Sequence, residues 1–580
     1  MTRQLSCEAD VCVVGGGMAG LCAALAAARR GAEVVLMHDR PVLGGNASGE
    51  CRVHICGADR NTRVPNARET GILEELRLAN LRWNRQRSFS VWDTILYDAA
   101  RRQERLTLML NCSACQAEMD GRRIVSVTGW QGTTEIHQRV AAKVFLDASG
   151  DGVLAPLTGA AFRVGREGRD EHGESLAPEV PDAGTMGMTL AFAARRHETP
   201  QPFTPPAWAR RFDRCEDLPG EHGWWQLGYW WVELGGLHEA VYDTERVRDE
   251  LLAVVYGVWD HIKNRCERHR DQAANWALEW VQFVPAKRES RRYVGRHVLR
   301  QDEVMSGGKF PDVVAFGGWT IDEHPPAGFA CGVLGRKPAY HASPPTYGIP
   351  YGVLVARDIE NLLLAGRCAS CTHIAMSSTR VMGTASVMGQ AAGTAAAIAC
   401  RSGIDPPAVA GHISELQQAL LADDAYLPGV RQEMPQAVTQ ARLVASSGDP
   451  EPLRDGVSRP VGDDAHAWDC RPSDSVEMHF ADPTLVDRLV LVADSALNEH
   501  VQMSFWGDAS RSLNAPPPSL LADARVEVLS GGKWTPAAEV RGNIRRLVRV
   551  PVARRADAVR LTVEKTWGAE DIRLFAAWVE

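Results

Sequence analysis

The pattern of apolar and polar residues at the start of the chain predicts a strand, a turn, a helix and a second strand. An apolar run at residues 11–14 precedes a glycine-rich turn, an alanine-rich stretch with helical spacing, and a second apolar run that ends before Asp39. Gly15, Gly17 and Gly20 are spaced so that the first allows a tight turn, the second lets backbone approach a pyrophosphate, and the third lets helix pack closely on strand. The helix N-terminus favours bound phosphate. We therefore predict a dinucleotide-binding unit.

The same patterning predicts elements further along the chain. Residues 68–82 and 91–105 are typical of amphipathic helices, and residues 106–147 of a meander of strands. From about residue 440 onward, short alternating runs separated by turns indicate an antiparallel β-sandwich.

Two further segments combine glycine turns with polar groups. Residues 141–160 predict a strand that passes into a glycine turn containing Asp151, which is either an ordinary Asp-Gly turn or an acid placed to bind a sugar or ribityl hydroxyl. Residues 361–399 predict a strand ending at Gly366, a polar loop, and a small-residue helix that begins near Thr384. The N-terminus of that helix would stabilise negative charge on a ligand.

Composition and charge narrow the class of protein. The chain has 580 residues, of which 45% are apolar and 23% charged, and its formal net charge is −8. This length predicts several domains. The negative charge argues against a nucleic-acid partner, which would require clustered Lys and Arg. No stretch approaches the ~18 apolar residues of a membrane helix and no signal peptide precedes the first strand, so we expect a cytoplasmic protein without a membrane partner.

Fourteen cysteines raise the question of a metal site or disulfides. Only Cys112 with Cys115, and Cys368 with Cys371, have the two-residue gap typical of a zinc knuckle or redox pair. The first pair lies in a predicted strand, and the second lies just before the small-residue helix. We therefore expect reduced, mostly buried thiols and no metal site.

Residues 166–344 are rich in tryptophan and contain clustered arginines. Four tryptophans lie within GWWQLGYWWVELGG, and we expect most tryptophans of this region in the core, with a subset lining a pocket. Arg288, Arg291 and Arg292 follow in PAKRESRRYVGR. On a helix they would form a solvated face or ion pairs with Glu289, whereas in a cleft they would hold a carboxylate or another polar substrate.

Four motifs occur in an order that resembles a known family. They are VVGGGMAG near the start, LGGNAS after the second strand, DASGDG in the middle, and NLLLAGR with RVMGTASVMGQAAGTAAA toward the end. Over roughly residues 9–425 the chain resembles the FAD-dependent oxidoreductases, which are related to the flavin subunits of fumarate reductases and to heterodisulfide-reductase-like flavoproteins. The resemblance implies that FAD is the cofactor.

The resemblance also implies which residues would contact FAD. The glycine loop would carry the pyrophosphate, the LGGNAS loop would border the flavin, the DASGDG turn would contact the ribityl or phosphate portion, and the start of the small-residue helix would lie against the isoalloxazine edge. The implied cofactor-binding residues are Gly15, Gly17, Met18, Ala19, Gly20, His38, Asp39, Arg40, Gly44, Gly45, Asn46, Ala47, Ser48, Asp151, Gly366, Arg367 and Thr384.

Two positions depart from the family pattern. His38 stands where a ribose-binding Glu is usual and Asp39 follows it, so either side chain is a candidate for the ribose. The LGGNAS motif lacks the adjacent His that tethers flavin covalently in some relatives. We expect dissociable FAD, while Cys51, His54 and Cys56 leave covalent attachment open.

The predicted fold class is α/β, with a Rossmann-like FAD-binding domain, an inserted substrate domain and a C-terminal antiparallel β-sandwich. The FAD-binding domain would comprise residues 1–165 and 345–430, the inserted substrate or cap domain residues 166–344, and the sandwich residues 440–580.

The expected sandwich is similar to discoidin or galactose-binding-like domains. The similarity lies in HAWDCRPSDSVEMHF, DRLVLVADS and DIRLFAAWV. It implies either carbohydrate binding or an architectural role. If glycans bind, the candidate stacking residues are Trp468, Trp506 and Trp534, although we expect each of them in the core.

These features together predict an FAD-dependent dehydrogenase or oxidase that transfers hydride from a small polar substrate to FAD. A carbohydrate or glycoside is favoured because of the sandwich. Such chemistry needs a base near the flavin. The candidate bases are Asp322, His324 and His373, and the candidate anion or oxyanion stabilisers are Arg288, Arg292 and Arg380.

Two other functions stay open at this point. A flavin monooxygenase would need reduction by NAD(P)H, for which the sequence has no second complete nucleotide-binding unit. A glycan-binding protein with a vestigial flavin site is the other alternative. The pattern leaves the electron acceptor unspecified and is compatible with an oligomer.

Overall fold

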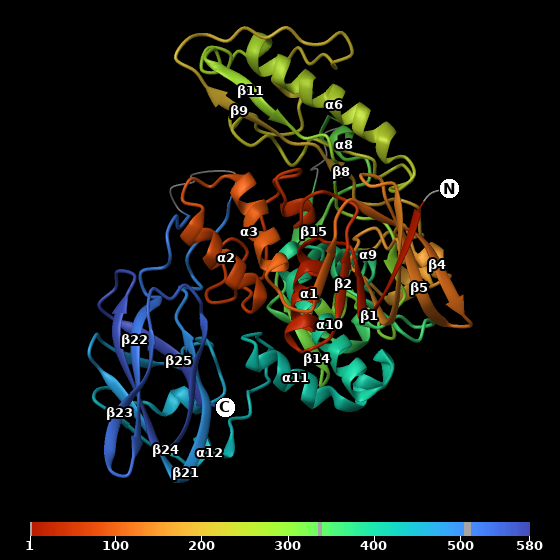
Figure 1. Ribbon diagram of the computed structural model, residues 1–580. Coiled ribbons are helices and arrows are strands. Elements are labelled where there is room, and N and C mark those ends of the chain that lie inside the picture. Colours follow the sequence, from red (N-terminus) through yellow and green to blue (C-terminus); the bar gives the residue numbers. More distant parts are fainter. Residues whose placement is uncertain (1–2, 334–338, 504–511) are drawn as a thin grey trace. The chain divides into compact units, whose positions relative to one another are not determined.

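The computed structural model describes residues 3–333, 339–503 and 512–580, and these form two compact units (Figure 1). Of the described residues, the first unit contains 3–57, 92–412 and 502–503, and the second contains 58–91, 413–501 and 512–580. Among the helices of these residues, none has both the length and the hydropathy required to cross a membrane.

The first unit is built on a mixed seven-stranded sheet in the order β3-β2-β1-β6-β5-β4, with β18 also paired to β6. β1, β2, β3, β6 and β18 are parallel, whereas β4 and β5 run antiparallel to their neighbours. The strands are β1 (Arg3–Val14), β2 (Val34–Met37), β3 (Leu106–Met109), β4 (Cys112–Asp120), β5 (Arg123–Gln131), β6 (Ile136–Asp147) and β18 (Leu362–Leu364). Val14 and Leu364 both pair with Asp147, so the carboxyl ends of three parallel strands meet at one edge. Ligands of open α/β sheets bind at such an edge.

The region predicted as a meander is only partly one. β4, β5 and β6 form the antiparallel meander, but β3 pairs in parallel with β2. Parallel pairing needs a crossover connection. Helix α3 (Phe89–Arg101), which lies just before β3, forms part of this crossover. The backbone of His38 then bonds to Met109 and Cys112 on both sides of the turn after β3.

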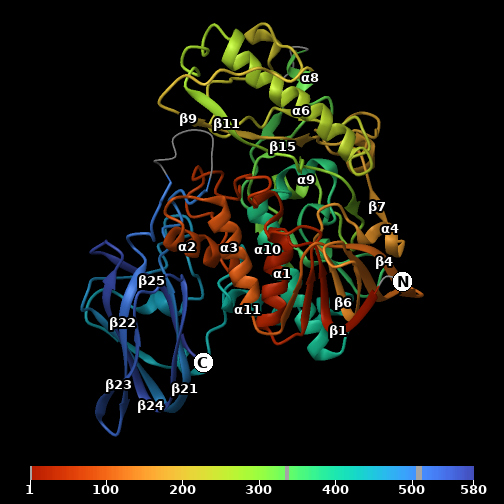
Figure 2. The same cartoon turned by 45° about the horizontal axis from the view of Figure 1, so that its top comes forward.

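Two long helices pack together beside the sheet (Figure 2). They are α1 (Met18–Arg29) and α10 (Met382–Ser402), and both are rich in small residues, as predicted. A Cβ atom added at Gly389 would lie 2.0 Å from the carbonyl oxygen of Ala19, and one added at Gly393 would lie 2.1 Å from that of Ala23. The two glycines therefore allow the helix backbones to touch.

Residues between the two parts of the nucleotide-binding sheet form a cap with its own core. Its longest helix is α6 (Thr244–Asp260), which lies along β9 (Phe192–Arg196) and β11 (Trp276–Val281) in Figure 1. Trp225, Trp231 and Trp259 are buried in this core, whereas Trp208 and Trp224 are more than half exposed, so only part of the tryptophans have the expected packing role.

The remaining elements of the cap and its surroundings are short. The strands are β7 (Phe162–Arg163), β8 (Met188–Thr189), β10 (Glu233–Leu234), β12 (Ala286–Lys287), β13 (Arg292–Tyr293), β14 (Val313–Gly317), β15 (Ile321–Glu323), β16 (Tyr340–Ala342) and β17 (Tyr347–Pro350). The helices are α4 (Leu154–Thr158), α5 (Arg169–His172), α7 (Gln301–Met305), α8 (Phe329–Val333) and α9 (His373–Thr379). The arginine-rich segment contains β12 and β13, so its helical interpretation is wrong.

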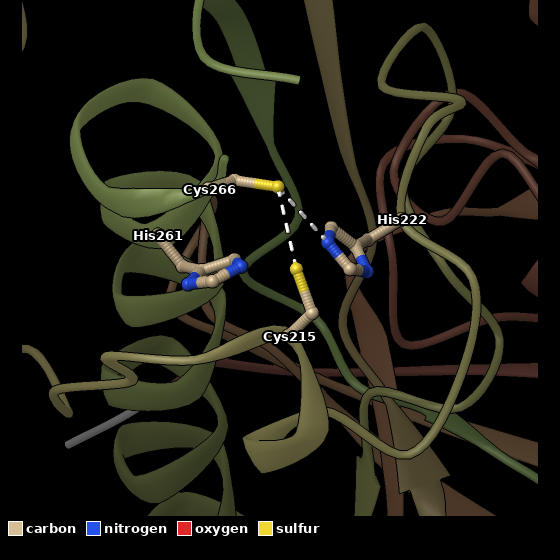
Figure 3. Close-up of side chains that lie close together, drawn as sticks. All are labelled: Cys215, His222, His261 and Cys266. Carbon is tan, nitrogen blue, oxygen red and sulfur yellow. Dashed lines mark hydrogen bonds between the residues drawn. The ribbon is translucent and has the colours of Figure 1, made fainter. Parts of the chain in front are cut away.

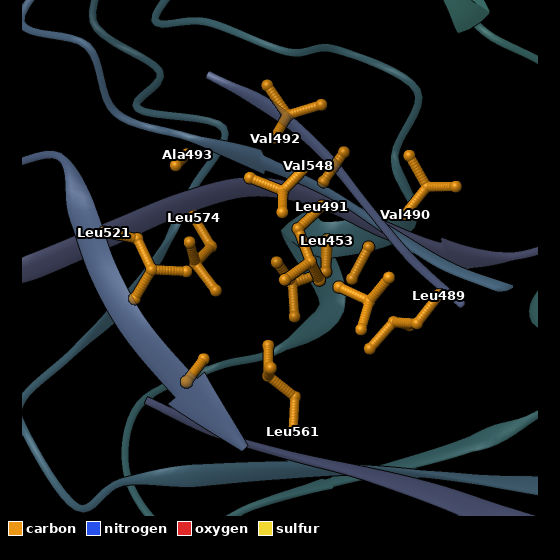
Figure 4. Packing of buried hydrophobic residues seen from close by; sticks show 14 of the residues in the cluster. Leu453, Leu489, Val490, Leu491, Val492, Ala493, Leu521, Val548, Leu561 and Leu574 are labelled. Carbon is orange, nitrogen blue, oxygen red and sulfur yellow. The ribbon is translucent and has the colours of Figure 1, made fainter. Parts of the chain in front are cut away.

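The second unit contains the predicted antiparallel β-sandwich. Its strands are β19 (Arg442–Ala445), β20 (Trp468–Cys470), β21 (Ser475–Ala493), β22 (Leu521–Ser530), β23 (Lys533–Val540), β24 (Leu547–Thr566) and β25 (Ile572–Val579). The pairing order is β20-β25-β21-β24-β22-β23, with β19 on β21. Register shifts interrupt the long β21–β24 pair, and such bulges bend strands. The last five residues of β21, from Leu489 to Ala493, are all buried and join Leu561 and Leu574 in the core (Figure 4).

Residues 58–91 also belong to the second unit. Leu78 and Leu81 of helix α2 (Ile72–Trp83) are part of the sandwich core. The fully buried Arg68 pairs with Glu74 and donates to the carbonyl oxygens of residues 495, 496 and 499. This unit also contains the helices α11 (Ile413–Ala422) and α12 (Gln436–Thr439).

The candidate glycan-stacking tryptophans have different environments. Trp468 is fully buried and its Nε1 donates to the carbonyl oxygen of Ser447, so its assignment to a stacking surface is wrong. The ring of Trp534 is covered by the Arg560 guanidinium at 3.9 Å. Trp506 lies outside the described residues.

Candidate active site

The three glycines of the first turn have the distinct environments that a pyrophosphate loop requires. Gly15 has a φ of 102°, and a Cβ at Gly20 would lie 1.8 Å from the carbonyl oxygen of Gly15. A Cβ at Gly17 would meet only Gly45 Cα, at 3.9 Å. At Gly15 and Gly20, backbone atoms therefore occupy the space that a side chain would need. Gly17 instead faces space that a bound group can use.

The N-terminus of α1 is prepared for an anion. Gly17 is its N-cap residue, no side chain caps the helix, and its first turn contains no acidic residue. Met18 and Ala19 form that first turn and are buried. Unpaired N–H groups and the helix dipole therefore face the open side of the cradle.

Two other predicted motifs meet this turn. The amide of Gly44 donates to the carbonyl oxygen of Gly16 at 2.9 Å, and Gly17 and Gly44 form an isolated parallel bridge. A Cβ at Gly366 would lie 3.1 Å from the Cβ of Ala19. The loop that begins at Gly44 continues through the 3₁₀ turn η1 (Gly45–Ala47) to the buried Ser48. The structure therefore brings together motifs that lie far apart in the sequence.

The two ribose candidates differ in availability. His38 is buried, its Nδ1 accepts from the amide of Gly16 at 3.0 Å, and its Nε2–H donates to the carbonyl oxygen of Val42 at 3.0 Å. Both ring nitrogens of His38 are thus engaged in hydrogen bonds that hold the glycine loop. The side chain of Asp39 is 58% exposed, whereas the neighbouring Arg40 lies 3.5 Å from Glu50. Asp39 is the better placed of the two for a ribose.

Asp151 lies in a network with two cations. Its carboxylate accepts from Arg367 at 2.6 Å, from Lys287 at 2.8 Å and from the hydroxyl of Ser290 at 2.8 Å. Burial alone would raise the pKa of Asp151, but Arg367 and Lys287 hold it well below its usual value. Asn46 joins the same region by donating to the carbonyl oxygen of Lys287. The Asp151 carboxylate is thus held by two cations beside the DASGDG turn.

The first turn of α10 contains an unpaired polar atom. Thr384 is fully buried, and its Oγ1 has no hydrogen-bond partner among the described residues. A buried hydroxyl without a partner is costly in a folded protein. A ligand with polar edges would satisfy it.

All six candidate catalytic residues gather in two ion-paired clusters. The first, called the Glu233 cluster, contains Glu233, Arg288, Asp322, His324 and Arg380. His324 Nδ1 lies 2.6 Å from Glu233 and its Nε2 lies 3.3 Å from Asp322. Arg380 donates to the carbonyl oxygen of Asp322 at 3.0 Å, and Arg288 lies 3.5 Å from Glu233. Burial opposes ionisation of Glu233 and Asp322, but Arg288 and the bond from His324 lower the pKa of Glu233, and the bond from His324 and the charge of Arg380 lower that of Asp322.

The second, called the Glu289 cluster, contains Glu167, Glu289, Arg292, Glu323 and His373. His373 Nδ1 lies 2.8 Å from Glu289 and its Nε2 lies 3.5 Å from Glu323. Arg292 pairs with Glu167 at 2.7 Å and with Glu289 at 3.1 Å. Burial by itself would lower the pKa of His373, but Glu289 and Glu323 raise it to about 9. His373 is therefore charged at neutral pH.

The sequence pattern missed four carboxylates as members of the site, although one signal could have found Glu323, which follows the predicted Asp322. Asp322 and Glu323 are neighbours on β15, and side chains that alternate along a strand point to opposite faces. Each therefore reaches a different cluster. Glu289 was considered only as an ion-pair partner. Glu167 and Glu233 carry no local signal, since they lie 125 and 91 residues from Arg292 and His324.

Comparison with known proteins agrees with this geometry. The FAD dependent oxidoreductase family matches residues 10–420, which is more than half of the chain. The chain belongs to this family. Its cofactor is FAD, and the protein is an FAD-dependent oxidoreductase with a C-terminal antiparallel domain.

Solved structures with similar folds cover both parts of this oxidoreductase. A geranylgeranyl bacteriochlorophyll reductase-like protein from Thermoplasma acidophilum is 12% identical over 72% of this chain and 86% of its own, with a TM-score of 0.32. The family 32 carbohydrate-binding module of Streptococcus pneumoniae EndoD is 19% identical over 25% of this chain and 97% of its own, with a TM-score of 0.20. The family 32 carbohydrate-binding module of Clostridium perfringens NanJ, solved in complex with galactose, is 11% identical over 25% of this chain and 95% of its own, with a TM-score of 0.19. Among curated proteins none matches the chain.

The cradle fits FAD on the observations above. The space at Gly17 and the uncapped N-terminus of α1 suit the pyrophosphate, and the unpaired hydroxyl of Thr384 suits a polar edge of the flavin ring. Of the residues considered for covalent attachment, Cys51 is buried, and burial raises the pKa of its thiol to about 11. A protonated thiol is a poor nucleophile. This argues against covalent attachment through Cys51.

Proposed function

We propose that this oxidoreductase is a dehydrogenase or oxidase that takes a hydride from a small polar substrate, for which a carbohydrate or glycoside is our favoured class. The observation that carries the proposal is that the candidate catalytic residues lie in two ion-paired clusters, which the neighbours Asp322 and Glu323 of β15 connect. Arg380 lies four residues before Thr384, so the chain itself connects the Glu233 cluster to the first turn of α10. When bound, FAD supplies the two-electron acceptor.

The two histidines are suited to different roles. With its pKa raised to about 9, His373 already carries a proton at neutral pH and cannot accept another. It would instead stabilise negative charge that develops during the reaction. The proton from a substrate hydroxyl would then pass to His324, whose Nδ1 is held by Glu233. A carboxylate that orients an imidazole in this way supports its use as a base.

The arginines of the Glu233 cluster would bind the substrate. Arg288 and Arg380 are mostly buried and lie 3.5 Å from Glu233 and 3.4 Å from Asp322, respectively. Guanidinium groups hold hydroxyl and carboxylate oxygens with defined geometry. A sugar or a sugar acid offers such oxygens next to the carbon that loses hydride. The galactose-binding-like motifs of the second unit favour the same substrate class.

Anaerobic reduction of the flavin tests the proposal. Sugars, glycosides and small hydroxy acids are mixed with the FAD-loaded enzyme, and loss of the oxidised flavin absorbance is followed in a stopped-flow instrument. For a substrate that reduces the wild type, His324→Gln should keep its FAD and reduce flavin ~10²–10⁴-fold more slowly. His412→Gln is the control, because His412 is an exposed histidine outside both clusters.

The outcomes separate the alternatives. Unchanged reduction in His324→Gln would show that another group is the base. If none of these compounds reduces the flavin but NADPH does, the proposal is wrong and a monooxygenase is indicated. If neither the tested compounds nor NADPH reduce the flavin, the proposal of a dehydrogenase for this substrate class is contradicted.

A further inference from the structure

Two cysteines and two histidines come together in the cap, away from the residues assigned to FAD and to the two catalytic clusters. They are Cys215, His222, His261 and Cys266, called the Cys2His2 cluster (Figure 3). One ligand atom from each lies within 4.8 Å of all the others. The two sulfur atoms are 3.6 Å apart, and Nε2 of His222 lies 3.3 Å from Sγ of Cys266. Three of the four residues are buried.

The local backbone explains how these residues meet. Cys215 begins the 3₁₀ turn η2 (Cys215–Asp217), and His222 follows in the same irregular segment. Helix α6 ends in a single π-helical stretch, η3 (His261–Arg265). The amide of Cys266 donates to the carbonyl oxygen of His261 at 2.7 Å. This wider turn brings residues five apart to one side, and π-helical turns are frequent at functional sites.

Hydrogen bonds behind the cluster orient both imidazole rings. Nδ1–H of His261 donates to the carbonyl oxygen of Phe212 at 3.1 Å, and Nδ1–H of His222 donates to that of Gly220 at 3.3 Å. With Nδ1 protonated, Nε2 of each ring is left with a lone pair directed at the thiols. His261 is fully buried, yet its Nε2 has no hydrogen-bond partner among the described residues. Metal-binding histidines typically have this arrangement.

The sulfur–sulfur separation and one nitrogen–sulfur separation suit a single tetrahedral ion. With Zn–S bonds of about 2.3 Å and Zn–N bonds of about 2.0–2.1 Å, tetrahedral angles place the ligand atoms roughly 3.3–3.8 Å apart. The sulfur pair at 3.6 Å and the nitrogen–sulfur pair at 3.3 Å lie in or at the edge of this range. A disulfide would require about 2.05 Å between the sulfur atoms. In a Rieske cluster the cysteines and histidines bind different irons, whereas here one histidine adjoins one cysteine.

We propose that the Cys2His2 cluster binds one Zn²⁺ ion as a structural site. Four protein ligands leave no open position for substrate, which distinguishes structural from catalytic zinc. The ion would fasten the irregular segment around Cys215 and His222 to the end of α6. That loop contains Trp225 and Trp231 of the cap core and leads into Glu233, so zinc would also maintain the fold that presents Glu233.

Metal analysis of the full-length protein tests the site. Wild-type protein purified without chelators should contain close to one zinc per chain by inductively coupled plasma mass spectrometry. Cys266→Ser and His261→Gln should contain almost none, while their ratio of FAD to protein stays at the wild-type value. Cys331→Ser is the matched control, because Cys331 is a buried cysteine of the cap outside the cluster. It should keep its zinc.

Cobalt provides a readout that does not depend on the variants folding. After zinc is removed from the wild type with a chelator, one equivalent of Co²⁺ should produce the d–d absorption of tetrahedral cobalt, at longer wavelength than flavin absorption. Absence of both zinc and the cobalt spectrum would overturn the proposal. So would a Cys215–Cys266 disulfide found by peptide mapping of freshly purified protein, or stoichiometric iron with inorganic sulfide. Full zinc content in both ligand variants would equally contradict it.

Discussion

The contact between α1 and α10 makes a sharp test of how the fold positions the cofactor. In Gly389→Ala the added Cβ would lie 2.0 Å from the carbonyl oxygen of Ala19 and 2.7 Å from its carbon. Ordinary van der Waals contact begins at 3.4 Å, so the two helices must separate by more than 1 Å. Ala19 belongs to the first turn of α1. Its displacement would therefore also disturb the N–H groups that face the pyrophosphate.

Two opposing contributions determine how much Gly389→Ala changes the free energy of unfolding. Overpacking a well-packed interior costs about 1–3 kcal/mol, and occasionally more. Both clashing groups here are backbone, which cannot rotate away, so we expect the upper end of this range. Alanine is favoured over glycine in a helix interior by about 1 kcal/mol. The net loss in the free energy of unfolding should be about 2 kcal/mol.

Two further glycines provide the comparison. Gly393→Ala creates the same overlap with Ala23, at 2.1 Å, but one helical turn further from the N-terminus of α1. It should lower stability equally and weaken FAD binding less. Gly411→Ala is the control, because its added Cβ would meet nothing within 4 Å.

The assay is thermal unfolding together with FAD titration of the apoprotein by fluorescence quenching. We expect a Tm several degrees lower for Gly389→Ala and Gly393→Ala, with the larger rise in Kd for Gly389→Ala. Wild-type stability and affinity in Gly389→Ala would refute the close packing of the two helices. Equal losses in Gly411→Ala would show that the effect is not one of packing.

Three other substitutions have definite expected outcomes. Gly17→Val should give a folded but colourless protein, measured by circular dichroism and flavin absorbance, because its side chain would occupy the pyrophosphate space without meeting backbone. The folded-state pKa of His373, about 9, lies above the ordinary 6.5, so its contribution to stability is complete below pH 6.5 and lost as the pH rises to about 9. His373→Gln should therefore flatten the decline of Tm between pH 7 and 9, and an unchanged decline would exclude this histidine as its source. Arg68→Met leaves Glu74 buried without its paired cation and should destabilise the second unit by about 3–5 kcal/mol. The loss should appear as faster hydrogen exchange of the β21 amides. Exchange as slow as in the wild type would contradict the burial of the Arg68–Glu74 pair.

The local sequence predicts the glycine loop of the cofactor cradle and the elements around it. Gly15 has a φ of 102°, and a Cβ at Gly20 would lie 1.8 Å from the carbonyl oxygen of Gly15, so these local requirements make the spacing of the two glycines predict the turn. A Cβ at Gly15 would also meet the distant backbone of Ala148 at 2.5 Å, which the local sequence does not reveal. The small residues of α10 likewise predicted close helix packing. Such features are readable because the periodicity of a helix or strand and the geometry of a tight turn depend on neighbouring residues.

Contacts between side chains that are far apart in the sequence become visible only in the tertiary structure. Glu233 reaches His324 across 91 residues, and Cys215 lies beside Cys266 across 51, with no spacing rule that connects either pair. Residues 58–91 lie in the sequence between elements of the nucleotide-binding sheet, yet they pack with the sandwich. These contacts depend on the register of the sheets, on the closure of loops and on the pairing of buried charges. All three are established only when the whole chain has folded.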